Sequence, residues 1–162
     1  MQLTKSYLII ILAIVLFLLL LGCKSKNEEA NKEVDQLPQK KELIKNEIEN
    51  VRDSLLSFHN EERIKNKLEI FDLDSNLCEY AQNHANYMFS INRLIHSNIS
   101  SVGAQFVAEN IAYGQENEKE VTKAWMNSYF HKMNILNKRY KKIGFGYFNK
   151  DGNTYWCAVF TN

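Results

Sequence analysis

Two histidines and one glutamate in the second half of the chain carry side chains that could do chemistry. His96, Glu109 and His131 lie in three separate segments of the sequence. Imidazole and carboxylate groups hold divalent metals and transfer protons near neutral pH. No His-Glu-x-x-His motif fixes these groups on one helix. A site therefore requires three segments of the chain to meet in the folded protein.

A metal site is the first interpretation of these residues. His96 and His131 would donate imidazole nitrogens to a divalent metal such as zinc. Glu109 would be a third ligand, or it would accept a hydrogen bond from an imidazole N–H. Because the ligands come from separate segments, we expect a weak, exchangeable site. Two imidazoles and a carboxylate also form catalytic zinc sites, so a metal-dependent hydrolase of peptide or cell-wall substrates stays an alternative.

Two further interpretations need no metal. Glu109 can be a structural carboxylate that accepts hydrogen bonds from buried backbone or from an imidazole. Alternatively, Ser128 is a nucleophile with His131 as its base, since residues three apart on a helix are neighbours. The sequence shows no glycine-rich elbow beside Ser128. No catalytic role is therefore assigned to Glu109, His131 or Ser128.

The helices that must position these residues follow from the spacing of apolar side chains. Steps of four and three predict an amphipathic helix from about Glu42 to Lys67. A second helix is expected to begin at a cap formed by Asp74 or Ser75 and to end near Asn92. From His96 to Gly114 the helical spacing is lost, which indicates a loop. A third helix is expected from about Lys119, with one face formed by Val121, Ala124, Trp125 and Ser128.

Two strands are expected near the end of the chain, Lys142–Phe148 and Thr154–Phe160, because aromatic and β-branched residues dominate both. The dipeptide Asp151-Gly152 between them is typical of a hairpin turn. Gly144 and Gly146 leave one strand face bare, for close helix packing or for a ligand. A hairpin that is apolar on both faces needs helices on both sides. The sequence therefore predicts an α+β fold, a three-layer α-β-α sandwich with a small, mostly antiparallel sheet.

Five short motifs follow one another from about Leu55 to Phe160. They are His-Ser at 96–97, Glu-Asn-Ile-Ala-Tyr-Gly at 109–114, Trp-x-x-Ser-x-x-His-x-x-Asn-Ile-Leu at 125–136, Ile-Gly-Phe-Gly at 143–146 and Tyr-Trp-x-x-x-Phe at 155–160. In this order they resemble the CAP superfamily (cysteine-rich secretory proteins, antigen 5 and pathogenesis-related proteins), in its bacterial SCP-like branch. The resemblance implies the same three-layer fold.

The resemblance also implies a shallow groove lined by two histidines and two glutamates. His96 and His131 match the histidines and Glu109 matches the first glutamate, whereas Ser128 stands where the second glutamate is expected. The residues predicted to border the groove are Ser128, Asn110 and Asn134. The family segment His59-Asn60-x-x-Arg63 is expected to tie the end of the first helix to a neighbouring loop.

The N-terminus predicts where the domain is located. Lys5 precedes an apolar run from Tyr7 to Leu21, and Gly22-Cys23 follows it. This pattern is typical of a secretory signal peptide, and the cysteine indicates a lipoprotein. We therefore expect three parts: a signal peptide at 1–22, lipidated Cys23 with a flexible tether at 23–41, and a CAP/SCP-like domain with an N-terminal helical extension at 42–162.

Lipid on Cys23 makes a membrane the first expected partner. Lys24 rather than Asp follows Cys23, which favours the outer membrane or cell surface in a diderm envelope. The balance of 20 basic and 19 acidic residues argues against nucleic acid as a partner. The one basic cluster, Lys138–Lys142, is expected to be a solvated loop or to contact anionic lipid or glycan.

These expectations favour a lipid-anchored envelope or surface protein that acts as a binding module for an unknown protein, glycan or lipid ligand. A metal-dependent hydrolase is one alternative. A sterol or lipid binder that uses the loop at Val102–Val107 is another. Once Cys23 is lipidated, Cys78 and Cys157 remain, either as a disulfide or as two buried thiols.

Overall fold

The computed structural model describes residues 37–162, which begin in a helix that covers residues 37–65. The other elements are β1 (Asp72–Leu73), α2 (Ser75–Ser90), the 3-10 helix η1 (Ile99–Val102), β2 (Val107–Tyr113), α3 (Glu118–Asn127), α4 (Tyr129–Ile135), β3 (Lys142–Lys150) and β4 (Asn153–Thr161). Residues 46–162 form one compact unit. Within residues 37–162, no helix has the length and hydropathy needed to cross a bilayer.

Several predictions concern the start of the chain. The signal peptide, Cys23 and the tether up to residue 36 lie outside the described residues. Residues 37–41, which were predicted as the end of the flexible tether, are helical. Lysine and glutamine are good helix formers, so a helix continues here without an apolar stripe. The predicted start of the helix at Glu42 is therefore too late.

Four strands form one sheet in the order β1-β3-β4-β2. β1 is parallel to β3, and the other two pairs are antiparallel, which confirms the mostly antiparallel sheet. The hairpin between β3 and β4 turns at Asp151 and Gly152, whose φ values of 54° and 80° suit a two-residue hairpin loop. β2 is an edge strand, with Glu109 opposite Val159 of β4.

β2 lies in the segment that was predicted to be a loop. Its five central residues, Ala108 to Ala112, are all buried although the strand contains a glutamate and an asparagine. A strand that is covered on both faces lacks the alternation of apolar and polar residues by which a half-buried strand is recognised. The loop prediction for 96–114 is therefore wrong over 107–113.

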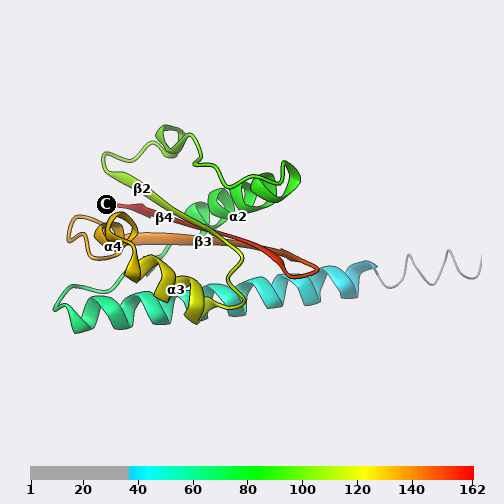
Figure 1. Cartoon of the computed structure of the whole chain (residues 1–162), viewed down its shortest axis with the longest axis horizontal. Coiled ribbons are helices and arrows are strands. Elements are labelled where there is room, and N and C mark those ends of the chain that lie inside the picture. Colours follow the sequence, from blue (N-terminus) through cyan, green and yellow to red (C-terminus); the bar gives the residue numbers. More distant parts are fainter. Residues whose placement is uncertain (1–36) are drawn as a thin grey trace, which may run out of the picture. The chain divides into compact units, whose positions relative to one another are not determined.

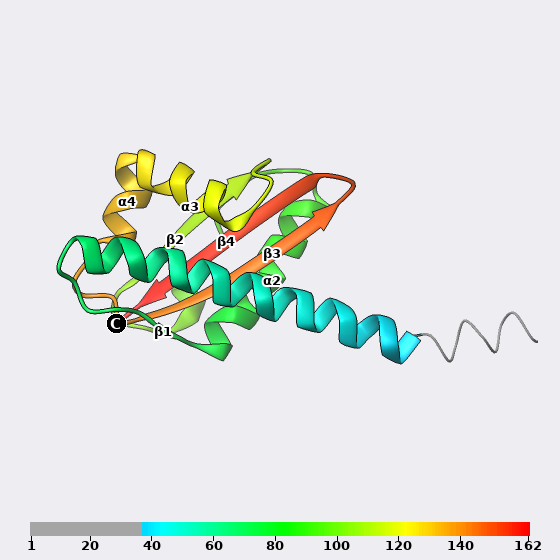
Figure 2. The ribbon, with the colours of Figure 1, turned by 90° about the horizontal axis from the view of Figure 1, so that it is seen from below.

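Helices cover both faces of the sheet, which confirms the three-layer sandwich. Figures 1 and 2 show α2 on one face, with α3, α4 and residues 46–65 of the first described helix on the other. The α2 face has a core cluster of Leu77, Ala81, Ala85, Met88, Ile111, Tyr155, Cys157 and Val159. The opposite face has a larger cluster around Trp125 and Trp156, each 1% exposed. Ala124 is exposed and does not belong to the buried face of α3.

Two predicted local features of the α2 layer are confirmed. Asp74 caps α2, because its carboxylate accepts hydrogen bonds from the backbone N–H groups of Asn76 and Leu77. Gly144 and Gly146 let α2 approach β3 closely. A Cβ atom added at Gly146 would lie 2.1 Å from the carbonyl oxygen of Ala81. The bare strand face therefore serves helix packing.

The buried side chain of Arg63 ties the first described helix to two loops, as the family segment predicted. The guanidinium is fully buried and lies over the ring of Phe71. It donates hydrogen bonds to the backbone carbonyl groups of Glu69, Ile135, Asn137 and Tyr140. The amide of Asn60 bonds the backbone N–H and carbonyl of Phe71. These contacts fix the segment between α4 and β3.

His59 is a second buried polar residue on this helix. Its ring packs against those of Trp125 and Phe145, and Nδ1–H donates to the Leu55 carbonyl oxygen at 2.8 Å. Nε2 has no hydrogen-bond partner in the described part of the chain. Burial lowers the pKa of His59 from 6.5 to about 4, so the imidazole is neutral in the folded protein at pH 7.

Replacing His59 with leucine should flatten the acid dependence of the free energy of unfolding. Between about pH 6.5 and pH 4 the unfolded chain binds a proton at this residue and the folded chain does not, so stability falls as the pH falls. Between pH 7 and pH 5 this residue alone should cost about 2 kcal/mol. Urea denaturation at both pH values measures the difference. The same pH dependence in H59L and wild type would contradict the neutral, buried imidazole.

Candidate functional site

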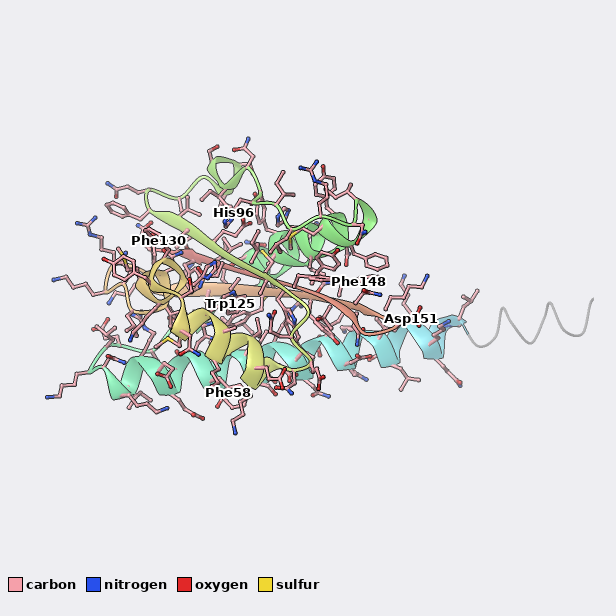
Figure 3. All side chains as sticks on the ribbon, in the orientation of Figure 1. Phe58, His96, Trp125, Phe130, Phe148 and Asp151 are labelled. Carbon is pink, nitrogen blue, oxygen red and sulfur yellow. The ribbon has the colours of Figure 1, made fainter. Side chains whose placement is uncertain are left out.

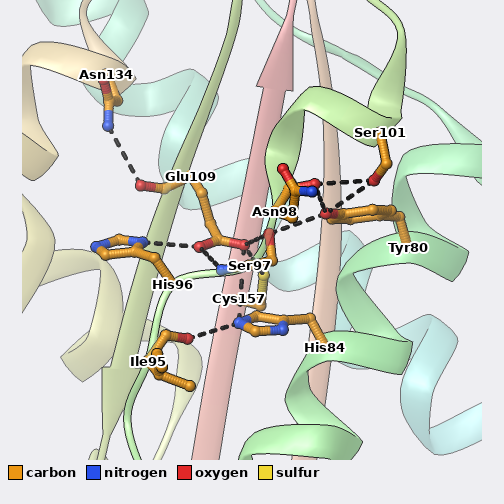
Figure 4. A network of polar contacts seen from close by, with 10 residues as sticks. All are labelled: Tyr80, His84, Ile95, His96, Ser97, Asn98, Ser101, Glu109, Asn134 and Cys157. Carbon is orange, nitrogen blue, oxygen red and sulfur yellow. Dashed lines mark hydrogen bonds and ion pairs between the residues drawn. The ribbon is translucent and has the colours of Figure 1, made fainter.

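The carboxylate of Glu109 is the centre of a polar network between β2 and the loop that follows α2 (Figure 4). Its side chain is 1% exposed. Oε1 accepts hydrogen bonds from His96 Nδ1–H at 2.7 Å and from the backbone N–H of Ser97 at 3.0 Å. Oε2 accepts from the Ser97 hydroxyl at 2.5 Å and from the Cys157 thiol at 3.7 Å. The network therefore joins β2, β4 and the 96–97 loop.

These four donors decide what Glu109 can do. An ionised carboxylate offers about four lone-pair sites, and each oxygen of Glu109 already accepts two hydrogen bonds. No lone pair is left for direct contact with a metal. The geometry suits Glu109 as the acceptor that orients an imidazole and holds the loop in place.

The imidazole of His96 is exposed to solvent, and its hydrogen bond to Glu109 holds the ring in one orientation. The side chain is 62% exposed. Because a carboxylate oxygen only accepts, the proton of the neutral ring lies on Nδ1, and Nε2 carries a free lone pair. Nε2 is therefore the atom of His96 that can bind a metal or accept a hydrogen bond from a ligand.

His131 reaches the same region from α4. Burial lowers the pKa of His131, and the electrostatic interaction with His96 lowers it further. The His131 backbone carbonyl accepts a hydrogen bond from the Asn110 side chain at 3.0 Å. Asn134 donates to the Asn110 side-chain oxygen at 2.8 Å and to the Glu109 carbonyl at 3.5 Å. Two asparagines thus tie α4 to the edge strand.

The three predicted border residues have different surroundings. Asn110 is fully buried, so it connects α4 to β2 and does not line an open groove. Asn134 is half-buried beside it. Ser128 lies in a break between α3 and α4, with extended backbone at φ −97° and ψ 124°. The prediction of one continuous helix through Ser128 is wrong.

The nucleophile interpretation gains no contact from the structure. Ser128 is the N-cap of α4 and has extended backbone, so it does not belong to one continuous helix with His131. Among the hydrogen bonds of residues 37–162, none joins the Ser128 hydroxyl to the His131 ring. A serine at neutral pH needs such a base to act as a nucleophile.

Three further residues take part in the network, although none of them was predicted as a site residue. Ser97 supplies two of the four donors to Glu109. His84 of α2 is 3.9 Å from Glu109 Oε2, and its Nε2 bonds the Ile95 carbonyl at 2.7 Å. Cys157 is a donor whose pKa is raised by burial and by the Glu109 charge. Only the register of β2 with β4 reveals Cys157, because it lies two residues from the partner of Glu109.

The two cysteines of the folded domain lie in its interior. Cys78 and Cys157 are both free and buried, which agrees with two thiols and not with a disulfide.

Within the described residues, no group of three or more His, Cys, Asp or Glu side chains has the placement of a metal site. His96 and His131 remain as two imidazoles on either side of the edge strand.

Comparisons with known proteins point to one family. The model of the cysteine-rich secretory protein family, CAP, matches residues 56–160. YkwD, an uncharacterized protein of Bacillus subtilis, is 34% identical over 112 residues, which are 62% of this chain and 43% of that protein.

Solved structures with this fold include an extracellular protein of Bacillus anthracis that contains an SCP domain. It has a TM-score of 0.64 and 22% sequence identity. The match covers 70% of this chain and 41% of that protein. An outer surface protein of Borrelia burgdorferi has a TM-score of 0.60 at 25% identity, over 65% of this chain and 87% of its own. The chain therefore spans less than half the length of the two Bacillus proteins.

Replacing Ser97 with alanine should destabilise the protein by about 2 kcal/mol, because a buried carboxylate loses a hydroxyl donor. S101A is the matched control, since the exposed Ser101 hydroxyl bonds only the Asn98 carbonyl and Tyr80. That control should change the free energy of unfolding by less than about 0.5 kcal/mol. Urea denaturation followed by tryptophan fluorescence compares them. Equal stability of S97A and S101A would contradict the central role of Glu109.

Proposed function

The chain belongs to the cysteine-rich secretory protein (CAP) family, and from this premise we propose that it is an exported binding module. In this proposal lipid on Cys23 holds the domain at a membrane, and ligands contact His96 and His131. The ligand is a protein, a glycan or a lipid, and a divalent metal such as zinc binds weakly in the same groove.

One observation carries the proposal, namely the hydrogen bond from His96 to Glu109. It holds an exposed imidazole in one orientation with Nε2 facing solvent. A ligand group that meets a fixed side chain loses less conformational entropy on binding than one that must order it. Burial also lowers the pKa of His131, which favours the neutral form of that imidazole. Neutral imidazoles are the form that binds metals.

The chemistry of these residues fits a metal held by two imidazoles, with water or a bound ligand completing the coordination. Glu109 would act through His96 and not on the metal directly, as outer carboxylates do in many histidine sites. Catalytic zinc sites use three protein ligands, and the described residues supply no third one here. This supports weak, exchangeable binding over metal-dependent hydrolysis.

A serine nucleophile and a sterol site receive no specific support. Ser128 lacks a hydrogen-bonded base in the described chain. Val102 and Val107, which flank the loop suggested for sterol binding, pack against the α2 core cluster. No particular contact therefore favours a serine hydrolase or a sterol binder.

Export and anchoring rest on the sequence of the first residues and on the relatives. The apolar run that ends at Gly22-Cys23 is the pattern of a lipoprotein signal. The names of two structural neighbours describe an extracellular protein and an outer surface protein. These observations support a location outside the cytoplasm for this chain as well.

Titration of the chain from Lys24 onward with zinc should release or absorb heat, measured by isothermal calorimetry at pH 7. H96A and H131A should each weaken binding at least about tenfold, since each removes one of two ligands. E109Q should weaken it about 10- to 100-fold, the range found for outer-shell partners. S128A is the matched control and should leave the affinity unchanged. Zinc affinity that is indifferent to both histidines would rule out this groove as the metal site.

Expression of the full chain in bacteria with labelled palmitate should label the protein through Cys23. C23S should abolish the label, because the thiol is the group that takes the lipid. C78S, which alters a buried thiol of the folded domain, should keep it. Gel fluorography measures the label. Palmitate that is retained in C23S would contradict the proposed anchor.

A further inference from the structure

α4 exposes large apolar side chains that a folded domain would normally bury. Tyr129 is 72% exposed and Phe130 is 76% exposed, and their rings contact each other edge to face. Met133 is 52% exposed on the next turn. Figure 3 labels Phe130 beside α4. A shallow hollow between these side chains is lined by Tyr129, Lys132, Met133 and Leu136.

We define the α4 patch as Tyr129, Phe130, Lys132, Met133 and Leu136. Ile135 is the buried residue of α4, so most of this short helix faces outward. Exposed apolar side chains that gather in one place mark sites of interaction with a protein or a membrane. The α4 patch is therefore a candidate interaction surface.

The charged residues of the segment that contains the patch are all basic. Residues 121–150 contain seven lysines and arginines and no aspartate or glutamate. Lys141 and Lys142 pair with Glu69 and Asp74. Lys132 within the patch, and Lys138 and Arg139 just after α4, form no ion pair in the described residues. Lys132 lines the same hollow as Tyr129, and Arg139 lies over the partly exposed ring of Phe106.

We infer that the α4 patch docks on an anionic lipid bilayer surface. Tyrosine rings and lysine side chains are typical of the membrane–water interface, where the ring enters the headgroup region and the ammonium stays in water. Basic residues attract the anionic headgroups. The cores of protein–protein interfaces, in contrast, are depleted of lysine and extend over about 800 Å² on each partner. A short helix with one lysine, followed by Lys138 and Arg139, fits the lipid surface better.

This docking goes beyond the anchor of the proposed function. Lipid on Cys23 would keep the domain near a bilayer, whereas the α4 patch would fix which side of the domain touches it. His131 follows Phe130 directly in α4, so docking would bring His131 close to the headgroup region. Docking is measured at Phe130, and anchoring is measured by palmitate on Cys23. The two proposals can therefore fail separately.

The test places a tryptophan in the patch of the full chain, as F130W, and adds vesicles with brominated acyl chains. One vesicle type holds phosphatidylcholine alone, and the other holds equal amounts of phosphatidylcholine and phosphatidylglycerol. The native Trp125 and Trp156 are each 1% exposed, so the quencher does not reach them. Y113W is the matched control, because Tyr113 is 46% exposed and bonds Asn153 at the hairpin end.

The expected result is that anionic vesicles quench at least half of the added F130W emission and leave Y113W emission unchanged. Vesicles without phosphatidylglycerol should quench F130W much less. The further changes K138E and R139E should restore the emission in anionic vesicles. Circular dichroism of each variant confirms that it is folded.

Four results would overturn the docking. F130W emission could be unchanged in anionic vesicles, or both reporters could be quenched equally. Quenching could also be the same with and without phosphatidylglycerol, which would remove the role of the basic residues. An F130W shift that follows protein concentration and not lipid would assign the patch to a second copy of the chain instead.

Discussion

The buried carboxylate of Glu109 is the interaction on which both the fold near the edge strand and the candidate site depend. A charge inside a protein needs donors that replace water, and here all of them come from the His96-Ser97 loop and from β4. The carboxylate of Glu109 therefore keeps its hydrogen-bond donors only when the His96-Ser97 loop holds this position. The orientation of His96 follows from the same contacts, so the site is positioned by what keeps the strand stable.

Asn110, the residue after Glu109, connects β2 to the helical layer on the other face of the sheet. Successive side chains of a strand point to opposite faces of the sheet, so Glu109 faces the α2 side and Asn110 faces α4. Asn110 bonds the His131 carbonyl and receives a hydrogen bond from Asn134. One dipeptide on an edge strand thus fixes both loop and helix. That is why two histidines far apart in the sequence lie on either side of β2.

Much of this arrangement could be predicted from the sequence where local signals are strong. The Asp74 cap, the hairpin at Asp151-Gly152 and the family motifs around His96 and Glu109 depend on near neighbours in the chain. β2 could not be recognised, because both of its faces are buried and its two polar residues, Glu109 and Asn110, are adjacent and do not alternate with apolar ones. The break at Ser128 was hidden because the helical spacing continues across it. The contact of the Cys157 thiol with Glu109 could not be predicted, because it depends on the pairing register of β2 with β4.

The contact of α2 with Gly144 and Gly146 has a consequence for how the sequence can change over time. On this side the helix backbone lies against the strand backbone, and even a methyl group would collide with it. On the other side, large rings and aliphatic chains fill the space between the layers, and such cores accept exchanges of similar volume. The two helical layers should therefore diverge at different rates among homologues, with the α2 side the slower.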